Sequence, residues 1–230
     1  MANYFTDNED IRFLFDHIDL KELARLQEDD FTRDRGNGDG YAPDDADDAV
    51  DSYRRVLEIV GQIAGDMIAP NAETIDREGN TLNPNGTVSL HPLVQQNLDR
   101  LSQADLMGFT LPRKYGGLNC PSLVYTMATE MVSRADASLM NLFGLQGIAE
   151  TIYAFADDEL KDAVLPRFAY GEVTGAMVLT EPDAGSDLQA VRLRAYQDEE
   201  GNWKLNGVKR FITNGCGEIL LVLARSEADI

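Results

Sequence analysis

The strongest constraint on the fold is a change in the spacing of apolar residues near Gly175. Before this point, apolar side chains recur every three or four residues, which is the spacing of one face of a helix. After it they alternate in short runs that are separated by turns, as in half-buried strands. Successive helical segments with no convincing strand before about residue 174 predict a bundle. We therefore expect an α+β chain, with a mostly helical N-terminal bundle followed by an antiparallel β domain.

The helical segments can be placed from this spacing. The first begins at Val50 and reaches Ile68, and Pro70 is expected to end it because proline lacks the N–H that a helix interior needs. Asp136 is a candidate N-cap, since a carboxylate there can accept hydrogen bonds from the first free N–H groups. The other expected helices cover residues 93–107, 122–134, 137–156 and 158–169. Residues 50–173 form the predicted helical domain.

The first 49 residues differ in composition from the rest of the chain. Residues 28–51 contain ten acidic residues, three glycines and few large apolar side chains, which is typical of an exposed linker. The preceding apolar residues indicate a short helical arm with contacts of its own: Ile11, Leu14, Phe15, Ile18, Leu23 and Leu26. We therefore interpret residues 1–49 as an N-terminal arm followed by an acidic linker.

Residues 174–230 form the predicted β domain. Asn206-Gly207 is a strong hairpin signal, because both residues tolerate the left-handed turn that joins antiparallel strands. The expected strands cover residues 177–179, 190–196, 203–205, 208–213 and 219–224, in a meander with another turn at 198–202. The sequence stops soon after a fully apolar strand, which would leave the sheet with an uncovered edge. We expect the natural protein to be longer and this β domain to be incomplete.

Charge and composition exclude several kinds of function. The chain has 20 basic and 40 acidic residues, a net charge of −20 that would repel nucleic acid and anionic membranes. No apolar run approaches the roughly 20 residues of a transmembrane helix, and the N-terminus has no signal-peptide pattern. Cys120 and Cys216 lack the spacing of a zinc site. We expect a cytoplasmic protein with free thiols and no metal.

One polar loop carries the candidate chemistry. Residues 180–187 read Thr-Glu-Pro-Asp-Ala-Gly-Ser-Asp and follow a short apolar strand. Backbone N–H groups in such a loop can face a phosphate or a heterocycle, and Gly185 permits close approach or a positive φ. Glu181 and Asp187 would repel a phosphate, so we expect them to point away and to cap or brace the loop. On spacing alone, an ordinary strand-to-loop junction is the favoured interpretation, since Gly-Ser-Asp loops are common.

This loop resembles the signature of the acyl-CoA dehydrogenase family. Further stretches resemble the family in its order and spacing, at residues 112–117, 133–138, 165–176 and 206–215. The resemblance extends from about residue 50 to 230, and several independent motifs in register make chance agreement improbable. The arm from Tyr4 to Leu26 resembles the extension of the longer bacterial members.

The resemblance implies FAD as the cofactor and gives residues of the loop specific roles. The backbone of Met177 and Leu179, with the Thr180 hydroxyl, would face the flavin ring. Leu179 and Thr180 would lie at the pyrimidine edge of that ring. Gly185 and Ser186 would lie near the FAD pyrophosphate, and Ser186 would also contact the CoA arm of a substrate.

A second block would line the other edge of the flavin. It contains Phe211, Ile212 and Thr213, and the resemblance implies that Thr213 hydrogen-bonds near N5 and O4 of the ring. Since strand side chains alternate, only part of this block can reach the flavin through side chains. The chain departs from the family at Phe211, where many members have Trp, at Met177, where an aromatic is frequent, and at Asp183, where a small residue is commoner.

The implied reaction is the FAD-dependent α,β-dehydrogenation of an acyl-CoA thioester, an oxidoreductase step of fatty acid metabolism. In the family the catalytic base is a glutamate of a C-terminal helical domain that this sequence lacks, so we assign no catalytic residue and expect the chain alone to be inactive. Electron transfer flavoprotein is the expected redox partner, and a homodimer or homotetramer is the expected full-length assembly. The alternatives are an acyl-CoA oxidase or flavin monooxygenase of the same fold, and a non-enzymatic helical module that binds a partner.

Overall fold

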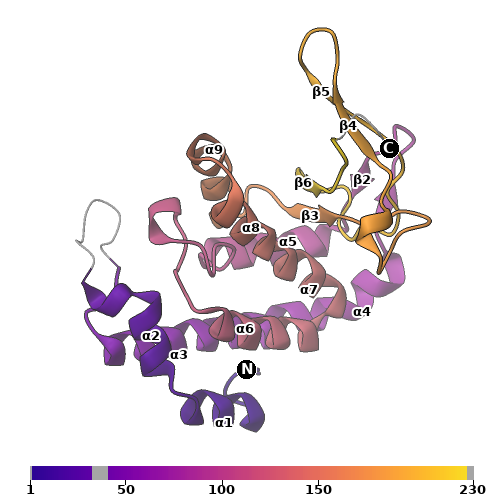
Figure 1. Cartoon of the computed structure of the whole chain (residues 1–230). Helices are drawn as coiled ribbons and strands as arrows, with labels where there is room; N and C mark the ends of the chain where they lie inside the picture. The colour runs from indigo at the N-terminus through magenta and orange to yellow at the C-terminus, as the bar shows by residue number, and fades with distance from the viewer. Residues whose placement is uncertain (1, 33–40, 227–230) are drawn as a thin grey trace. The chain divides into compact units, whose positions relative to one another are not determined.

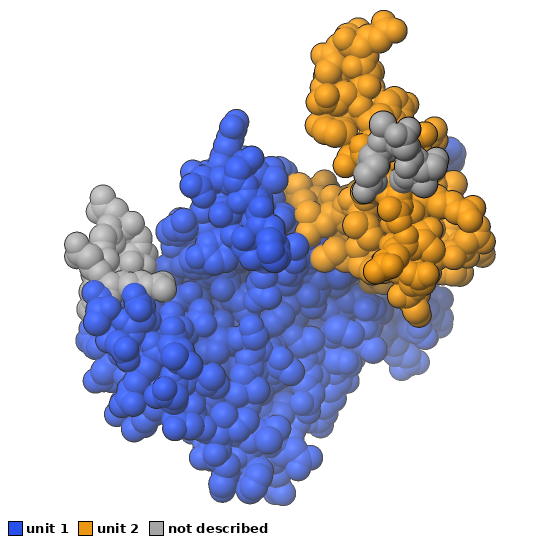
Figure 2. Space-filling model, in the orientation of Figure 1, with its two compact units in different colours: residues 1–172 blue, residues 173–230 orange. Residues whose placement is uncertain are grey.

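The computed structural model describes residues 2–32 and 41–226 of the 230-residue chain. The chain divides into two compact units, Met1–Glu172 and Val173–Ile230 (Figure 2). Within the described ranges, the first unit contains every α-helix, and the second contains every strand longer than two residues (Figure 1). The predicted α+β fold class is confirmed.

Each of the five helical segments predicted after residue 50 is helical in the first unit, and a further helix at Ala69–Glu78 was not predicted. The helices of this unit are α1 (Glu9–His17), α2 (Leu20–Gln27), α3 (Ala46–Ile63), α4 (Ala69–Glu78), α5 (Pro92–Gln103), α6 (Ser122–Ala135), α7 (Ala137–Gly144), α8 (Ile148–Phe155) and α9 (Asp158–Ala169). Asp136 caps α7 as predicted, since its Oδ1 accepts hydrogen bonds from the N–H groups of Ser138 at 2.8 Å and Leu139 at 3.1 Å. A 3-10 turn at Leu145–Gly147 divides the single helix predicted over 137–156 into α7 and α8. Two short strands, β1 (Thr81–Leu82) and β2 (Val88–Ser89), form an antiparallel pair between α4 and α5.

The prediction that Pro70 ends a helix was wrong. α3 continues through a π-helical turn at Ala64–Ile68 directly into α4, and Pro70 lies in the first turn of α4. Ala69 N–H donates to the carbonyl of Ala64, five residues earlier, and this change of hydrogen-bond partners just before the proline accommodates its ring and its missing N–H within the helical run. The helical run ends instead at Gly79, whose φ of 69° is in the left-handed region.

The N-terminal arm is part of the core of the first unit. Phe5, Ile11 and Phe15 are buried in the same cluster as residues of α3 and α6, whereas Leu14 and Leu26 are 44% and 71% exposed. The predicted linker is shorter than expected, because α3 already begins at Ala46. Its first residue, Glu28, is buried and accepts two hydrogen bonds of 2.7 Å from the Arg113 guanidinium. Residues 33–40 of the predicted linker lie outside the described part of the chain.

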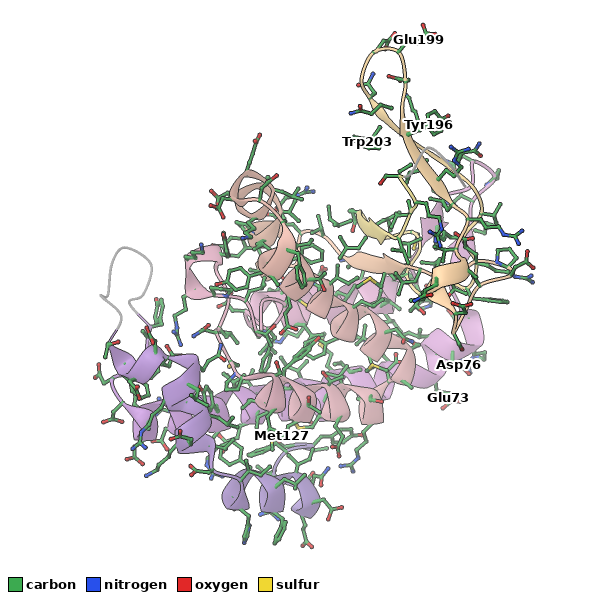
Figure 3. All side chains as sticks on the ribbon, in the orientation of Figure 1. Glu73, Asp76, Met127, Tyr196, Glu199 and Trp203 are labelled. Carbon is green, nitrogen blue, oxygen red and sulfur yellow. The ribbon has the colours of Figure 1, made fainter. Side chains whose placement is uncertain are left out.

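The second unit has four strands in the region that the structure describes. They are β3 (Gly175–Val178), β4 (Arg194–Gln197), β5 (Trp203–Asn206) and β6 (Ile219–Val222), with a 3-10 turn at Leu188–Ala190. β4 and β5 form an antiparallel hairpin around the predicted turn at 198–202, and Figure 3 shows Tyr196 and Trp203 on its two strands and Glu199 at its tip. β3 and β6 are parallel, with Gly175 opposite Ile219. The second unit is therefore not the antiparallel meander that the sequence predicted.

Two other predictions about the β domain, a turn at 206–207 and a strand at 208–213, were wrong. Asn206-Gly207 is not a hairpin turn, because Asn206 is the last residue of β5 and pairs with Arg194 of β4. Gly207 has a φ of 149°, and a Cβ there would lie 2.8 Å from Leu193 Cα, so glycine is needed for a close approach. Residues 208–213 form no strand, and Phe211 within them has a φ of 59°, which is incompatible with extended backbone.

Replacing Gly61 by Ala is expected to destabilise the first unit. In an open helix this change adds about 0.5–1 kcal/mol of stability, but here the new Cβ would lie 2.5 Å from the backbone N of Phe5 in the arm. Overpacking of this kind costs about 1–3 kcal/mol. Chemical denaturation should therefore show a lower free energy of unfolding. Gly147→Ala is the control, since its Cβ would meet nothing within 4 Å; equal effects of both changes would contradict the tight contact.

Candidate functional site

The site is built on β3, whose two edges differ. The carbonyl groups of Thr174 and Val178 accept backbone hydrogen bonds of 3.1 Å from the chain of β6. Because backbone groups alternate along a strand, Gly175, Met177 and Leu179 direct their N–H and C=O groups to the opposite edge. No described strand pairs with that edge, which leaves polar backbone groups available to another partner.

The segment 207–215 runs beside this edge and is fixed to it at two points. Asn214 Nδ2 donates to the Gly175 carbonyl at 3.0 Å, and Lys209 Nζ donates to the Leu179 carbonyl at 2.8 Å. Met177 lies between these two points on β3, and no described backbone group pairs with its N–H and C=O on this edge. Phe211 lies between Lys209 and Asn214 in the sequence and is 80% exposed.

Glu181 joins the loop after β3 to the rest of the second unit. Its carboxylate accepts hydrogen bonds from Arg192 N–H at 2.7 Å, Leu193 N–H at 2.9 Å and Lys209 Nζ at 2.9 Å. The Glu181 and Lys209 side chains are only 7% and 6% exposed. Burial alone would raise the pKa of Glu181, but these hydrogen bonds and the ammonium charge outweigh burial and lower the pKa to about 2. Glu181 therefore braces the loop, as the sequence predicted.

The rest of the loop forms a tight turn. The backbone groups of Glu181 and Ala184 exchange hydrogen bonds of 2.8 and 3.2 Å. Asp187 Oδ1 accepts from Gln189 N–H at 3.1 Å and caps the following 3-10 turn, as expected. Gly185 does not have the positive φ that the sequence allowed, and a Cβ at this position would meet nothing within 4 Å. The packing of the unit itself therefore does not require glycine at 185.

The structure brings the two predicted blocks together at one point. Arg210 N–H donates to the Thr180 carbonyl at 2.9 Å. Arg210 directly precedes the 211–213 block, so this bond brings the start of that block close to Thr180. The hydroxyls of Thr180, Ser186 and Thr213 form no hydrogen bond with any part of the chain that the structure describes. Ser186 lies beyond the tight turn and makes no such bond to the 211–213 block.

Sequence reasoning missed the two side chains that fix this arrangement, Lys209 and Asn214. Both lie within the stretch 206–215 that resembles the family. Their partners, Leu179 and Gly175, are 30 and 39 residues earlier in the chain, and no local pattern indicates such a contact. The sequence alone gives no sign that Lys209 is buried, since most lysines are exposed.

Other kinds of site find no support among residues 2–32 and 41–226. No group of three or more His, Cys, Asp or Glu side chains could hold a metal ion there, and no helix within these ranges is long and apolar enough to cross a membrane. Both cysteines are free, and burial raises the pKa of the Cys120 thiol to about 12. A cavity of about 710 Å³ in the first unit is lined by none of the predicted site residues.

Comparisons with known proteins agree on one family. Residues 51–172 match the family model for the N-terminal domain of acyl-CoA dehydrogenase, and residues 176–229 match the model for its middle domain. 3-Methylmercaptopropionyl-CoA dehydrogenase of Ruegeria pomeroyi is 35% identical over 187 residues, which cover 77% of this chain and 31% of that protein. Mitochondrial isovaleryl-CoA dehydrogenase of Solanum tuberosum is 32% identical over 77% of this chain and 41% of its own length. The chain thus spans less than half of either relative.

A solved structure of an acyl-CoA dehydrogenase also resembles the fold of this chain. Glutaryl-CoA dehydrogenase from Mycobacterium smegmatis, in complex with FADH2, matches with a TM-score of 0.65 and 27% sequence identity. The match covers 76% of this chain and 43% of that protein.

Replacing Glu181 by Gln is expected to reduce the pH dependence of stability. The folded-state pKa of about 2 lies below the ordinary value of 4.5, so the ionised carboxylate stabilises the fold above pH 4.5 and loses this effect as the pH falls toward 2. The variant has no such group, so its free energy of unfolding should fall less over this interval in urea titrations. At neutral pH it should be less stable by about 3–5 kcal/mol, because Lys209 stays buried without a counter-charge.

The control for this experiment is Glu200→Gln, which removes an exposed carboxylate from the β4–β5 turn of the same unit. It should leave the pH dependence close to that of the unmodified chain. An identical pH profile for Glu181→Gln and the unmodified chain would contradict the hydrogen-bonded, ionised state of Glu181.

Proposed function

The chain belongs to the acyl-CoA dehydrogenase family, and from this premise we propose that it forms the FAD-binding wall of an acyl-CoA dehydrogenase. The proposed reaction is the FAD-dependent α,β-dehydrogenation of an acyl-CoA thioester. The names of the two curated relatives, both dehydrogenases of CoA thioesters, support this reaction class. Because the chain spans less than half of these relatives, the activity of the whole protein is part of the proposal.

The observation that carries the proposal is the unpaired edge of β3 beside residues 209–214. The pyrimidine part of a flavin has an N–H donor between two carbonyl acceptors, so it can bond to peptide groups much as a strand does. Met177 and Leu179 direct backbone groups to this edge. The free hydroxyls of Thr180 and Thr213 add a donor and acceptor each. This set of groups fits the cofactor.

We assign the FAD pyrophosphate to Gly185 and Ser186. The open space at Gly185 lets an anion approach the backbone, and the Ser186 hydroxyl can donate to a phosphate oxygen or to the CoA arm. Two of the three signature carboxylates do not oppose this assignment, and the third, Asp183, is exposed, so solvent and salt screen its charge. Glu181 is buried and paired with Lys209, and Asp187 is engaged by Gln189 N–H.

FAD, when bound, supplies the ring that accepts hydride from the β-carbon of the substrate. The residues of this chain bind and orient that ring. Met177, Leu179 and Thr180 hold its pyrimidine edge, while Phe211, Ile212 and Thr213 line the other edge and keep water away from it. Thr213 is the proposed hydrogen-bond partner near N5 and O4. We assign no residue of this chain to the removal of the substrate proton.

The remaining parts of the proposal concern the whole protein. The domain scheme is an arm and linker at 1–49, a helical domain at 50–173 and a middle β domain at 174–230. Electron transfer flavoprotein is the proposed electron acceptor, a homodimer or homotetramer the proposed assembly, and the cytoplasm the proposed compartment.

The direct test is to express the gene product, with any residues encoded on either side of this chain, and to examine its flavin. The purified protein should be yellow with bound FAD, and acyl-CoA substrates of graded chain length should bleach the flavin under anaerobic conditions. A colourless protein that takes up no added FAD would contradict the proposal and favour a non-enzymatic module. Rapid reoxidation of the reduced flavin by oxygen would indicate an oxidase or monooxygenase instead.

Thr180→Val is expected to weaken FAD binding by about tenfold, because one hydrogen bond of about 1.4 kcal/mol is lost. Valine has nearly the shape of threonine, so the backbone of the loop should stay in place. Fluorescence titration of the apoprotein with FAD measures the change. Thr151→Val in α8 is the control and should leave the affinity unchanged; equal affinities for all three proteins would rule out the assigned role of Thr180.

A further inference from the structure

We infer that Lys209 is a positioning residue whose buried charge sets the electron affinity of the flavin bound at the β3 edge. The inference rests on the proposed function and adds a residue to it. Lys209 Nζ donates to the Leu179 carbonyl at 2.8 Å and to Glu181 Oε1 at 2.9 Å. Its charge therefore lies at the same edge of β3 to which Met177 and Leu179 direct their backbone groups.

The location of this charge matters because a flavin gains negative charge when it accepts hydride. That charge spreads over the pyrimidine part of the ring, the part assigned to Leu179 and Thr180. A cation near this edge stabilises the reduced ring more than the oxidised ring. At 6% exposure, Lys209 is shielded from water and salt, so its field is stronger than that of a surface lysine.

Glu181 opposes this effect through its own charge. Its carboxylate is 2.9 Å from the Lys209 ammonium and 7% exposed, and it is held by Arg192 N–H and Leu193 N–H. The flavin would therefore experience a partly neutralised cation. Removing Lys209 and removing the charge of Glu181 should shift the flavin in opposite directions.

This opposition separates an electrostatic role from a merely structural one. If the pair only held the loop in place, either substitution would loosen the same loop, and both would change the flavin in the same sense. The β4–β5 hairpin provides a matched control, the ion pair of Lys204 with Asp198 at 3.3 Å. Lys204 is 52% exposed, so removal of its charge should be screened by solvent.

The experiment measures the two-electron reduction potential of FAD bound to the expressed gene product by spectroelectrochemistry. Lys209→Met should lower the potential, with an expected tenfold fall in the ratio of affinities for reduced and oxidised FAD, about 30 mV for a two-electron couple. Glu181→Gln should raise the potential. Lys209→Arg, which keeps the charge, should restore most of the loss, and Lys204→Met should change nothing. Shifts of the same sign in Lys209→Met and Glu181→Gln, or no shift in either, would overturn the inference.

The design also separates this inference from the proposed function. If the unmodified protein binds no FAD, the proposed function fails and the inference fails with it. If the protein binds FAD and the potentials of the variants are unchanged, only the inference fails. Should Lys209→Met lose its flavin, the comparison of Glu181→Gln with the unmodified protein decides the question: a raised potential supports the inference, and a lowered or equal one overturns it.

Discussion

The buried ion pair between Lys209 and Glu181 is the interaction on which the candidate site depends. It joins the loop after β3 to a stretch of chain about 30 residues later, through the Leu179 carbonyl and the Glu181 carboxylate. The backbone hydrogen bond from Arg210 N–H to the Thr180 carbonyl, at 2.9 Å, fixes the same end of the 209–214 segment beside it. Burying two charges is costly, and the cost is offset because Glu181 also accepts two backbone hydrogen bonds.

The same ion pair explains why an acidic signature loop can accept an anionic cofactor. Glu181 is turned into the unit and neutralised, and Asp187 is engaged by the backbone of the next turn. Apart from the exposed Asp183, whose charge is screened by solvent, the outward groups are peptide N–H groups, hydroxyls and an open glycine, which attract phosphate and heterocyclic carbonyls. The loop thus combines a strongly acidic sequence with a surface suited to FAD.

Local patterns predicted the local features well and the distant contacts poorly. α9 and the cap at Asp136 follow from residues within one helical turn of each other. The prediction that a helix ends at Pro70 failed because a π turn, which has no clear sequence pattern, precedes the proline and lets the helical run continue. The parallel pairing of β3 with β6 depends on residues more than 40 positions apart, so alternation alone could not reveal it.

The site was predictable to a similar degree. The resemblance indicated Thr180 and the 211–213 block, and the Arg210 hydrogen bond to Thr180 places these two blocks next to each other. The roles of Lys209 and Asn214 were not predictable, because a side chain that spans two segments gives no periodic signal. The left-handed backbone at Phe211 was equally hidden, since an aromatic residue rarely adopts it.

The most direct test of the account is a crystal structure of the whole gene product grown with FAD. The account predicts electron density for the isoalloxazine ring against the outer edge of β3, with hydrogen bonds to the backbone of Met177 or Leu179 and Lys209 still bonded to Glu181. Another strand of the protein paired along that edge, leaving no room for a tricyclic ring, would contradict it.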